Sequence, residues 1–252
     1  TENGYEMAGS YLNGKVVDSI GGGICQVSTT LYNAVLRAEL EVTERHNHSM
    51  IVTYVKPSMD AAIAGYYKDL KFVNNLDAPI YIEGYTVGKD IYFNIYGQET
   101  RPSNRKVTYE SEVVSEEDPG TQFVATGDAI GSISTTQGKH MGYVARLWKI
   151  VTVDGVEQSR DAINKSTYKS SPKIVNVGTA SADPNAVAAV NAALATGDEA
   201  TIYATVAQYS GAGQTPSEAP AEAPADSSAE AAAILGTVDE SQITGNTTTE
   251  GQ

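Results

Sequence analysis

The sequence has a single cysteine, and this scarcity excludes an internal disulfide. No stretch of about 18 consecutive apolar residues occurs, so we expect no membrane span within this chain. Lysine and arginine are absent after Lys173, although ten of the 31 Asp and Glu residues lie there. The net charge of −14 is therefore concentrated toward the C-terminal end. Because no basic patch stands out, the charge pattern predicts no nucleic-acid partner.

The 252 residues suffice for two ordinary domains, and the sequence patterns divide them into four parts. We predict a first domain over 1–98, a second module over 105–180, an Ala-rich helical or linker segment over 181–209 and a disordered acidic tail over 210–252. The tail consists mainly of Ala, Pro, Glu, Ser, Thr and Gly, which bury too little apolar surface to offset chain entropy. The chain opens at Thr1 without an initiator Met, so we expect a fragment or mature segment whose targeting or anchoring part lies outside it.

The first part combines one helical pattern with several strand patterns. Apolar residues recur at helical spacing from Ile24 to near Glu41. Residues 43–54 read as a strand, and the runs 79–87 and 90–97 alternate aromatic and polar residues around a turn at Gly88-Lys89. Asn13-Gly14 indicates an earlier hairpin. These patterns predict an α+β domain with one helix on a mostly antiparallel sheet, similar in class to transglutaminase or papain-like folds.

The second part has no long helical pattern. Two β-rich runs flank Asp154-Gly155, and an Asp-Gly step between such runs favours a tight hairpin. We therefore predict a small all-β module. Beyond it, Asp183 and Pro184 suit the cap and first turn of a helix in the Ala-rich segment.

The lone thiol is the first candidate functional residue. Three glycines, Gly21 to Gly23, lead into the predicted helix, and Cys25 lies at its start. The N-terminal end of a helix favours a thiolate, which is the nucleophilic form of cysteine. The alternative is a small hydrophobic residue that fills a tight contact between helix and sheet.

Further candidates follow Cys25 in the order Cys, His, Asp, which is the order of papain-like and transglutaminase-like sites. His48 is the preferred base because it begins the apolar run into the predicted sheet. His46 is the alternative, because residues two positions apart on a strand point to the same face. Asp60 would orient the imidazole, and Gln26 could donate to an oxyanion. If the site is not catalytic, the two histidines are polar residues on a solvent-exposed strand face, and Asp60 is a carboxylate in a turn.

A zinc site is the rival reading of Cys25, His46, His48 and Asp60, because all four are competent ligands. Neither Cys-x-x-Cys nor His-Glu-x-x-His occurs in the sequence to support it. We therefore predict no metal and no cofactor.

Several motifs in one order resemble the VanW-like family. They are residues 21–34 (GGGICQVSTTLYNA), 44–49 (ERHNHS), 60–61 (DA) and 69–75 (DLKFVNN). The resemblance covers about residues 1–97, and the opening segment of the family is shortened here. It implies a cell-envelope protein of Gram-positive bacteria, in a family named after a gene of a vancomycin-resistance cluster and without an established activity.

Residues 106–179 resemble the G-five cell-surface module. The resemblance rests on residues 151–160 (VTVDGVEQSR) and 174–179 (IVNVGT). It implies adhesion or glycan binding, and the pairing of such a module with a VanW-like domain is itself familiar.

Together these observations predict an extracellular or cell-envelope protein, attached through a part outside this chain. We expect it to be associated with peptidoglycan and with glycopeptide resistance, and to act on wall peptides through a Cys-His-Asp thiol site. The activity would be that of a cysteine-dependent peptidase, amidase or acyltransferase. The alternative is a non-catalytic module that binds peptidoglycan peptide or glycan.

Overall fold

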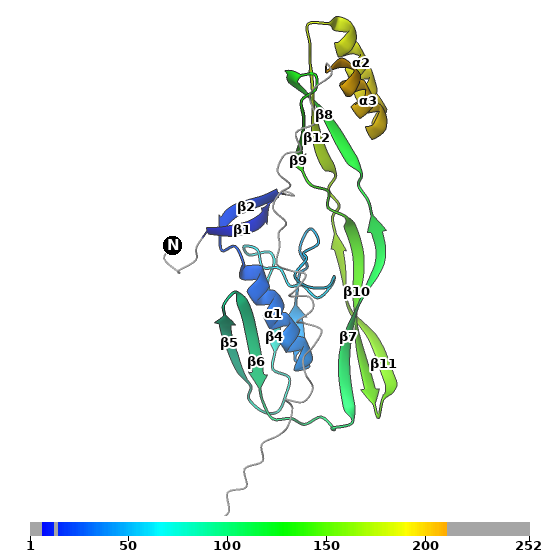
Figure 1. The fold of residues 1–252 in the computed structure, drawn as a ribbon. Coiled ribbons are helices and arrows are strands. Elements are labelled where there is room, and N and C mark those ends of the chain that lie inside the picture. Colours follow the sequence, from blue (N-terminus) through cyan, green and yellow to red (C-terminus); the bar gives the residue numbers. More distant parts are fainter. Residues whose placement is uncertain (1–6, 13–14, 211–252) are drawn as a thin grey trace, which may run out of the picture.

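The computed structural model describes residues 7–12 and 15–210 of the chain. This part of the chain is mostly β-structure with three helices (Figure 1). None of the described helices has the length and apolar character needed to cross a membrane. The predicted Asn13-Gly14 turn and residues 211–252 of the predicted disordered tail lie outside the described residues.

The first region contains one described helix and three antiparallel strand pairs, β1–β2, β3–β4 and β5–β6. The pairs form separate two-stranded sheets rather than one continuous sheet. The predicted turn at Gly88-Lys89 joins β5 to β6 as expected. The elements are β1 (Met7–Leu12), β2 (Lys15–Ile20), α1 (Ile24–Arg37), β3 (Glu41–Glu44), β4 (Lys71–Val73), β5 (Tyr81–Val87) and β6 (Asp90–Tyr96).

Helix α1 begins directly after a glycine turn. Gly21 and Gly23 have φ values of 84° and 87°, a left-handed conformation that is costly for residues with a Cβ atom. No side chain caps the helix, and Gly23 occupies the N-cap position. The apolar positions of α1 then recur on one buried face, which includes Tyr32, Val35 and Leu36.

The predicted strand over 43–54 is wrong beyond its first two residues. Strand β3 ends at Glu44, because its partner β4 is only three residues long. The segment that follows has no ladder partner, and its polar groups bond to side chains or to single backbone groups such as the Ala62 N–H, which donates to the His46 carbonyl. The backbone N–H of His48, for example, donates to Asp60 Oδ2 at 2.7 Å.

The second region is all-β, as predicted, and forms two three-stranded sheets. One sheet has the order β11-β10-β7 and is antiparallel, while the other has the order β8-β12-β9 and contains the parallel pair β8–β12. The Asp154-Gly155 turn joins β10 to β11, and both residues have positive φ values. The strands are β7 (Arg105–Glu117), β8 (Thr121–Ala129), β9 (Ile133–Gln137), β10 (Gly142–Val153), β11 (Val156–Tyr168) and β12 (Lys173–Ala180).

Two helices, α2 (Pro184–Thr196) and α3 (Glu199–Tyr209), pack at the far end of the second region (Figure 1). The Asp183 side chain caps α2 by accepting from the Asn185 N–H, as predicted. Val190 and Ile202 from these helices bury against Val175 and Val177 of β12. The Ala-rich segment is therefore a helical pair that shares its core with β12.

A second core joins the two regions. Leu147 of β10 is fully buried against Tyr32 and Leu36 of α1, together with apolar residues of the 52–61 segment. The Tyr109 hydroxyl of β7 donates to the backbone carbonyl of Leu36. The sheet β11-β10-β7 is therefore part of the packing that supports α1 (Figure 1).

Candidate functional site

Cys25 lies in the first turn of α1, immediately after the glycine turn. Its thiol is partly buried, and Sγ lies 3.5 Å from the carbonyl oxygen of Ile63. His48 lies close enough to lower the pKa of the thiol through hydrogen bonding and charge. Backbone N–H groups in the first turn of a helix have no intrahelical acceptor, and the helix dipole is positive there. This position therefore favours negative charge on the sulfur.

His48 connects the sulfur to a carboxylate. Its Nδ1 lies 2.7 Å from Asp60 Oδ2, and its Nε2 lies 3.3 Å from the hydroxyl of Tyr54. The rings of His48 and Tyr54 meet edge to face, with centroids 6.1 Å apart. These contacts fix the orientation of the imidazole beside Cys25.

Asp60 is fully buried and accepts four hydrogen bonds. Oδ2 accepts from the ring and from the backbone N–H of His48, both at 2.7 Å. Oδ1 accepts from Arg45 Nη2 at 2.8 Å and from the hydroxyl of Tyr168. A buried carboxylate with this many donors is held in one position and stays ionised.

The three groups shift one another's pKa values in a consistent direction. Burial alone would raise the pKa of the Cys25 thiol, but the hydrogen bond and charge of His48 lower it overall. Burial opposes protonation of His48, yet Asp60 and Cys25 raise its pKa to about 9. The pKa of Asp60 is lowered despite burial, chiefly by His48 and then by Arg45. This balance shifts the thiol toward its thiolate form and keeps His48 protonated at neutral pH.

The other two predicted site residues, His46 and Gln26, bond to neither His48 nor Asp60 in the described part of the chain. His46 Nε2 lies 3.1 Å from Glu44 Oε1, and the side chain of Gln26 is exposed on α1. Because 45–54 is not a strand, His46 and His48 do not share a strand face. Over 7–12 and 15–210, no group of three or more His, Cys, Asp and Glu side chains is arranged to hold a metal ion.

Sequence reasoning missed two partners of Asp60. Arg45 pairs with the carboxylate and also donates from Nε to the backbone carbonyl of Asp60 at 2.6 Å. Its place within the 44–49 motif is the signal that could have found it. Tyr168 lies on β11 of the second region, 108 residues beyond Asp60, and no local pattern links the two.

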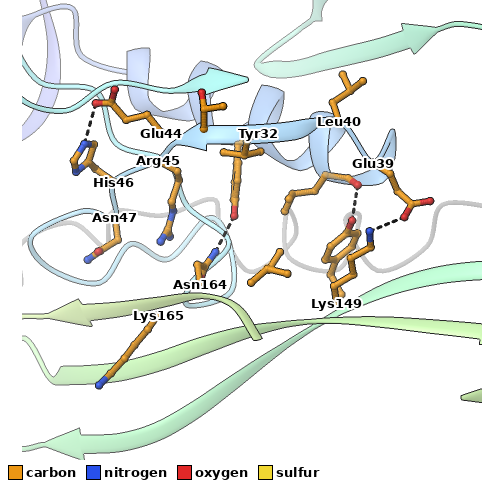
Figure 2. A pocket seen from close by; sticks show the side chains of 15 residues that line it. Tyr32, Glu39, Leu40, Glu44, Arg45, His46, Asn47, Lys149, Asn164 and Lys165 are labelled. Carbon is orange, nitrogen blue, oxygen red and sulfur yellow. Dashed lines mark hydrogen bonds and ion pairs between the residues drawn. The ribbon is translucent and has the colours of Figure 1, made fainter. Parts of the chain in front are cut away.

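Two pockets open beside the site. The larger, of about 460 Å³, lies between the two regions, and Figure 2 shows Arg45 and His46 on one side of it and Asn164 and Lys165 on the other. Asn164 Nδ2 donates to the Tyr32 hydroxyl across this pocket at 2.8 Å (Figure 2). The smaller, of about 250 Å³, shares His46 and Asn47 with the first and is also lined by His48. His48 can therefore be reached from the surface between the regions.

The two regions correspond to two protein families. Residues 1–96 match the family model described as VanW like protein, and residues 100–180 match that of the G5 domain. The chain therefore consists of a VanW-like region followed by a G5 domain, as the resemblances predicted. Both families together indicate a cell-envelope or extracellular protein.

A curated relative matches 96 residues of the chain. It is the uncharacterized protein YoaR of Bacillus subtilis (strain 168), which is 38% identical over 96 residues. The match covers 38% of this chain and 32% of YoaR, so the chain spans about a third of that relative's length.

Two solved structures are similar to the G5 domain. The IgA1 protease G5 domain is 25% identical with a TM-score of 0.24, and the match covers 31% of this chain and 94% of that one. The crystal structure of HP0197-G5 is 20% identical with a TM-score of 0.16, covering 29% of this chain and 99% of that one.

Proposed function

We propose that the VanW-like region is a cysteine-dependent peptidase, amidase or acyltransferase that acts on peptides of the bacterial cell wall. The observation that carries this proposal is that His48, whose ring bonds to the buried carboxylate of Asp60, acts on Cys25 at the start of α1. A structural cysteine needs no imidazole, and a structural histidine needs no buried carboxylate with four donors. An extension to glycopeptide resistance rests on the family resemblance alone.

In the proposed reaction, the Cys25 thiolate attacks the carbonyl carbon of an amide bond and forms an S–C bond. The His48 imidazolium then gives its proton to the leaving nitrogen as the C–N bond breaks, so an amine leaves and a thioester remains. Water or an acceptor amine next attacks the thioester carbonyl carbon, and neutral His48 takes its proton. The S–C bond then breaks, so the Cys25 thiolate is regenerated and the acyl group leaves as a carboxylic acid or a new amide. Asp60 keeps the imidazole oriented through both steps and stabilises its charged form.

The developing oxyanion needs donors near the sulfur. The backbone N–H of Cys25 lies in the first turn of α1, where intrahelical acceptors are lacking, and the side-chain amide of Gln26 comes from the same turn. We assign both to oxyanion stabilisation. His46, paired with Glu44, has no catalytic part in this scheme.

The test is incubation of the protein with purified cell-wall peptide fragments, followed by mass spectrometry of the products. Loss of a leaving amine, or its replacement by an acceptor amine, is expected from the wild-type chain and from His46→Ala. Cys25→Ser and His48→Ala should be inactive. Turnover that persists in Cys25→Ser would contradict a thiol mechanism.

A second candidate function is glycan binding without catalysis, and one surface favours it. Cross-strand pairs Tyr81–Tyr96 and Tyr85–Tyr92 stack on an exposed face of β5–β6, with ring centroids 6.0 and 5.2 Å apart. Between them, Asn94 Nδ2 donates to Glu83 Oε2 at 3.0 Å. Aromatic rings beside carboxylate and amide groups suit the apolar faces and hydroxyls of a sugar.

Sedimentation with insoluble peptidoglycan separates the two functions. If the tyrosine face binds glycan, Tyr85→Ala with Tyr92→Ala weakens co-sedimentation, whereas Cys25→Ser leaves it unchanged. Equal binding by the wild type, the double tyrosine variant and Cys25→Ser would exclude this face as the glycan site.

A further inference from the structure

The smaller pocket beside His48 has a one-sided charge. Its lining includes two lysines, Lys68 from the VanW-like region and Lys169 from the G5 domain, and contains no Asp or Glu. The other lining residues are His46, Asn47, His48, Ser49 and Thr167. The pocket is thus polar, positively charged and contributed by both regions.

Each lysine donates a hydrogen bond to a backbone carbonyl of the 47–49 segment. Lys68 Nζ donates to the backbone carbonyl of Asn47 at 2.7 Å, which leaves two of its three N–H groups for another acceptor. The backbone N–H of Lys169 donates to the carbonyl of Ser49 at 2.7 Å and so ties the end of β11 to the pocket.

Neither ammonium group is neutralised by a close carboxylate. Among the described residues, Lys71, Lys139 and Lys149 form ion pairs within 4.0 Å, whereas Lys68 and Lys169 form none. Both lysines line the same pocket as His48, and the charges of Asp60, Cys25 and Lys169 all act on Lys68. Two like charges that face one pocket without a counterion favour an anionic ligand.

We propose that this pocket binds a carboxylate of the substrate beside the acyl group that Cys25 attacks. The substrates would be peptides with a free carboxylate close to the scissile bond, and amidated peptides would be poor substrates. Lys68 and Lys169 would determine specificity without taking part in bond changes. The reaction in this inference rests on the proposed thiol function, but the binding does not.

Charge-selective alkylation tests the inference with the thiol as a reporter. Iodoacetate is anionic and iodoacetamide is neutral, and both alkylate the same sulfur. The ratio of their rates at Cys25, divided by the same ratio for the chain unfolded in urea, should exceed one. In Lys68→Met with Lys169→Met we expect this normalised ratio to fall roughly fivefold, and added salt should lower it in the wild type. Lys89→Met, an exposed lysine in the β5–β6 turn, is the matched control.

The outcomes separate the two proposals. A normalised ratio near one, with rapid alkylation by both reagents at pH 6, would overturn the anion site and leave the thiolate intact. A thiol that reacts with neither reagent at pH 6 would overturn the proposed function, and the anion site is then judged by binding alone.

That binding measurement is calorimetric titration of the Cys25→Ser protein. Acetyl-Ala-Ala with a free C-terminal carboxylate, its C-terminal amide, and acetyl-Ala-Glu amide are the probes. The inference is supported if either acidic peptide binds more tightly than the neutral amide and if this preference is lost in the double lysine variant. Which of the two acidic peptides binds more tightly shows whether the pocket prefers a terminal or a side-chain carboxylate. Equal binding of all three peptides, or no binding of any, would overturn it.

Discussion

At the scale of single residues, Asp60 has the most consequential position. Its carboxylate is bonded at one oxygen to His48 and at the other to Arg45 and Tyr168. One side chain thereby orients the imidazole, neutralises a buried guanidinium and contacts the G5 domain. A change at Asp60 should affect both reactivity and stability.

We predict that Asp60→Asn lowers the pKa of His48 from about 9 to below its usual range. Burial is the largest influence on this imidazole and opposes its charge, so it dominates once the carboxylate charge is removed. The thiol pKa should rise in turn, and NMR titration of the His48 ring would show both changes.

The same substitution should cost roughly 3–5 kcal/mol of unfolding free energy, because Arg45, whose side chain is only 7% exposed, loses its counterion. Urea denaturation measures this cost, and Asp69→Asn, which changes an exposed carboxylate, is the control. An unchanged His48 titration in Asp60→Asn would contradict the coupling.

At the scale of elements, the turn before α1 sets where the thiol lies. Gly23 has φ of 87° and is followed within two residues by Cys25. We predict that Gly23→Ala costs about 1–2 kcal/mol, because a Cβ atom is strained in this conformation even though its nearest neighbour would be Gln26 Oε1 at 3.8 Å. Thermal unfolding checks the cost. Gly127→Ala, at a position with open space and no positive φ, should be nearly neutral, and equal effects at both positions would refute the argument.

How far the elements could be predicted depended on whether their determinants were local. The helix from Ile24, the turns at Gly88-Lys89 and Asp154-Gly155 and the cap at Asp183 all follow from neighbouring residues, and the structure contains them. The strand over 43–54 failed because a strand needs a partner, and β4 is too short to supply one. Val52 of that run is buried in the shared core instead, together with Val55 just beyond it.

In the candidate site, too, local features could be predicted from the sequence and long-range contacts could not. Residue types and their order pointed to Cys25, His48 and Asp60. In the structure, His48 bonds to Asp60 and lowers the pKa of the Cys25 thiol. Contacts made across more than a hundred residues, such as Asp60 with Tyr168, depend on how the G5 sheet docks. The sequence of the first region contains no trace of that docking.

At the scale of the whole molecule, the two regions are joined by charge as well as by apolar packing. Glu39 follows α1, and its carboxylate pairs with Arg105 of β7 and Lys149 of β10. The hydrogen bond from Arg105 is the main cause that lowers the pKa of Glu39 to about 2, against the effect of burial.

We predict that Glu39→Gln destabilises the chain at pH 7 by about 3 kcal/mol. A carboxylate whose pKa is lowered on folding stabilises the protein above its unfolded pKa, near 4.5, and this contribution is lost as the pH falls through about 2. The difference between variant and wild type in urea denaturation should therefore shrink between pH 4.5 and 2. Glu41→Gln, at an exposed position on β3, is the control, and a difference that does not change with pH would contradict the assignment.

The central claim is a thiolate–imidazolium pair, and the pH dependence of Cys25 alkylation by iodoacetamide tests it most directly. The account predicts rapid alkylation well below the pKa of about 8.5 of a free thiol. In His48→Ala the midpoint should move above that value, because burial of the thiol is then unopposed by the imidazole, while His46→Ala should match the wild type. The claim would be contradicted if the pH profiles of the wild type, His48→Ala and His46→Ala coincide, with a midpoint near that of a free thiol.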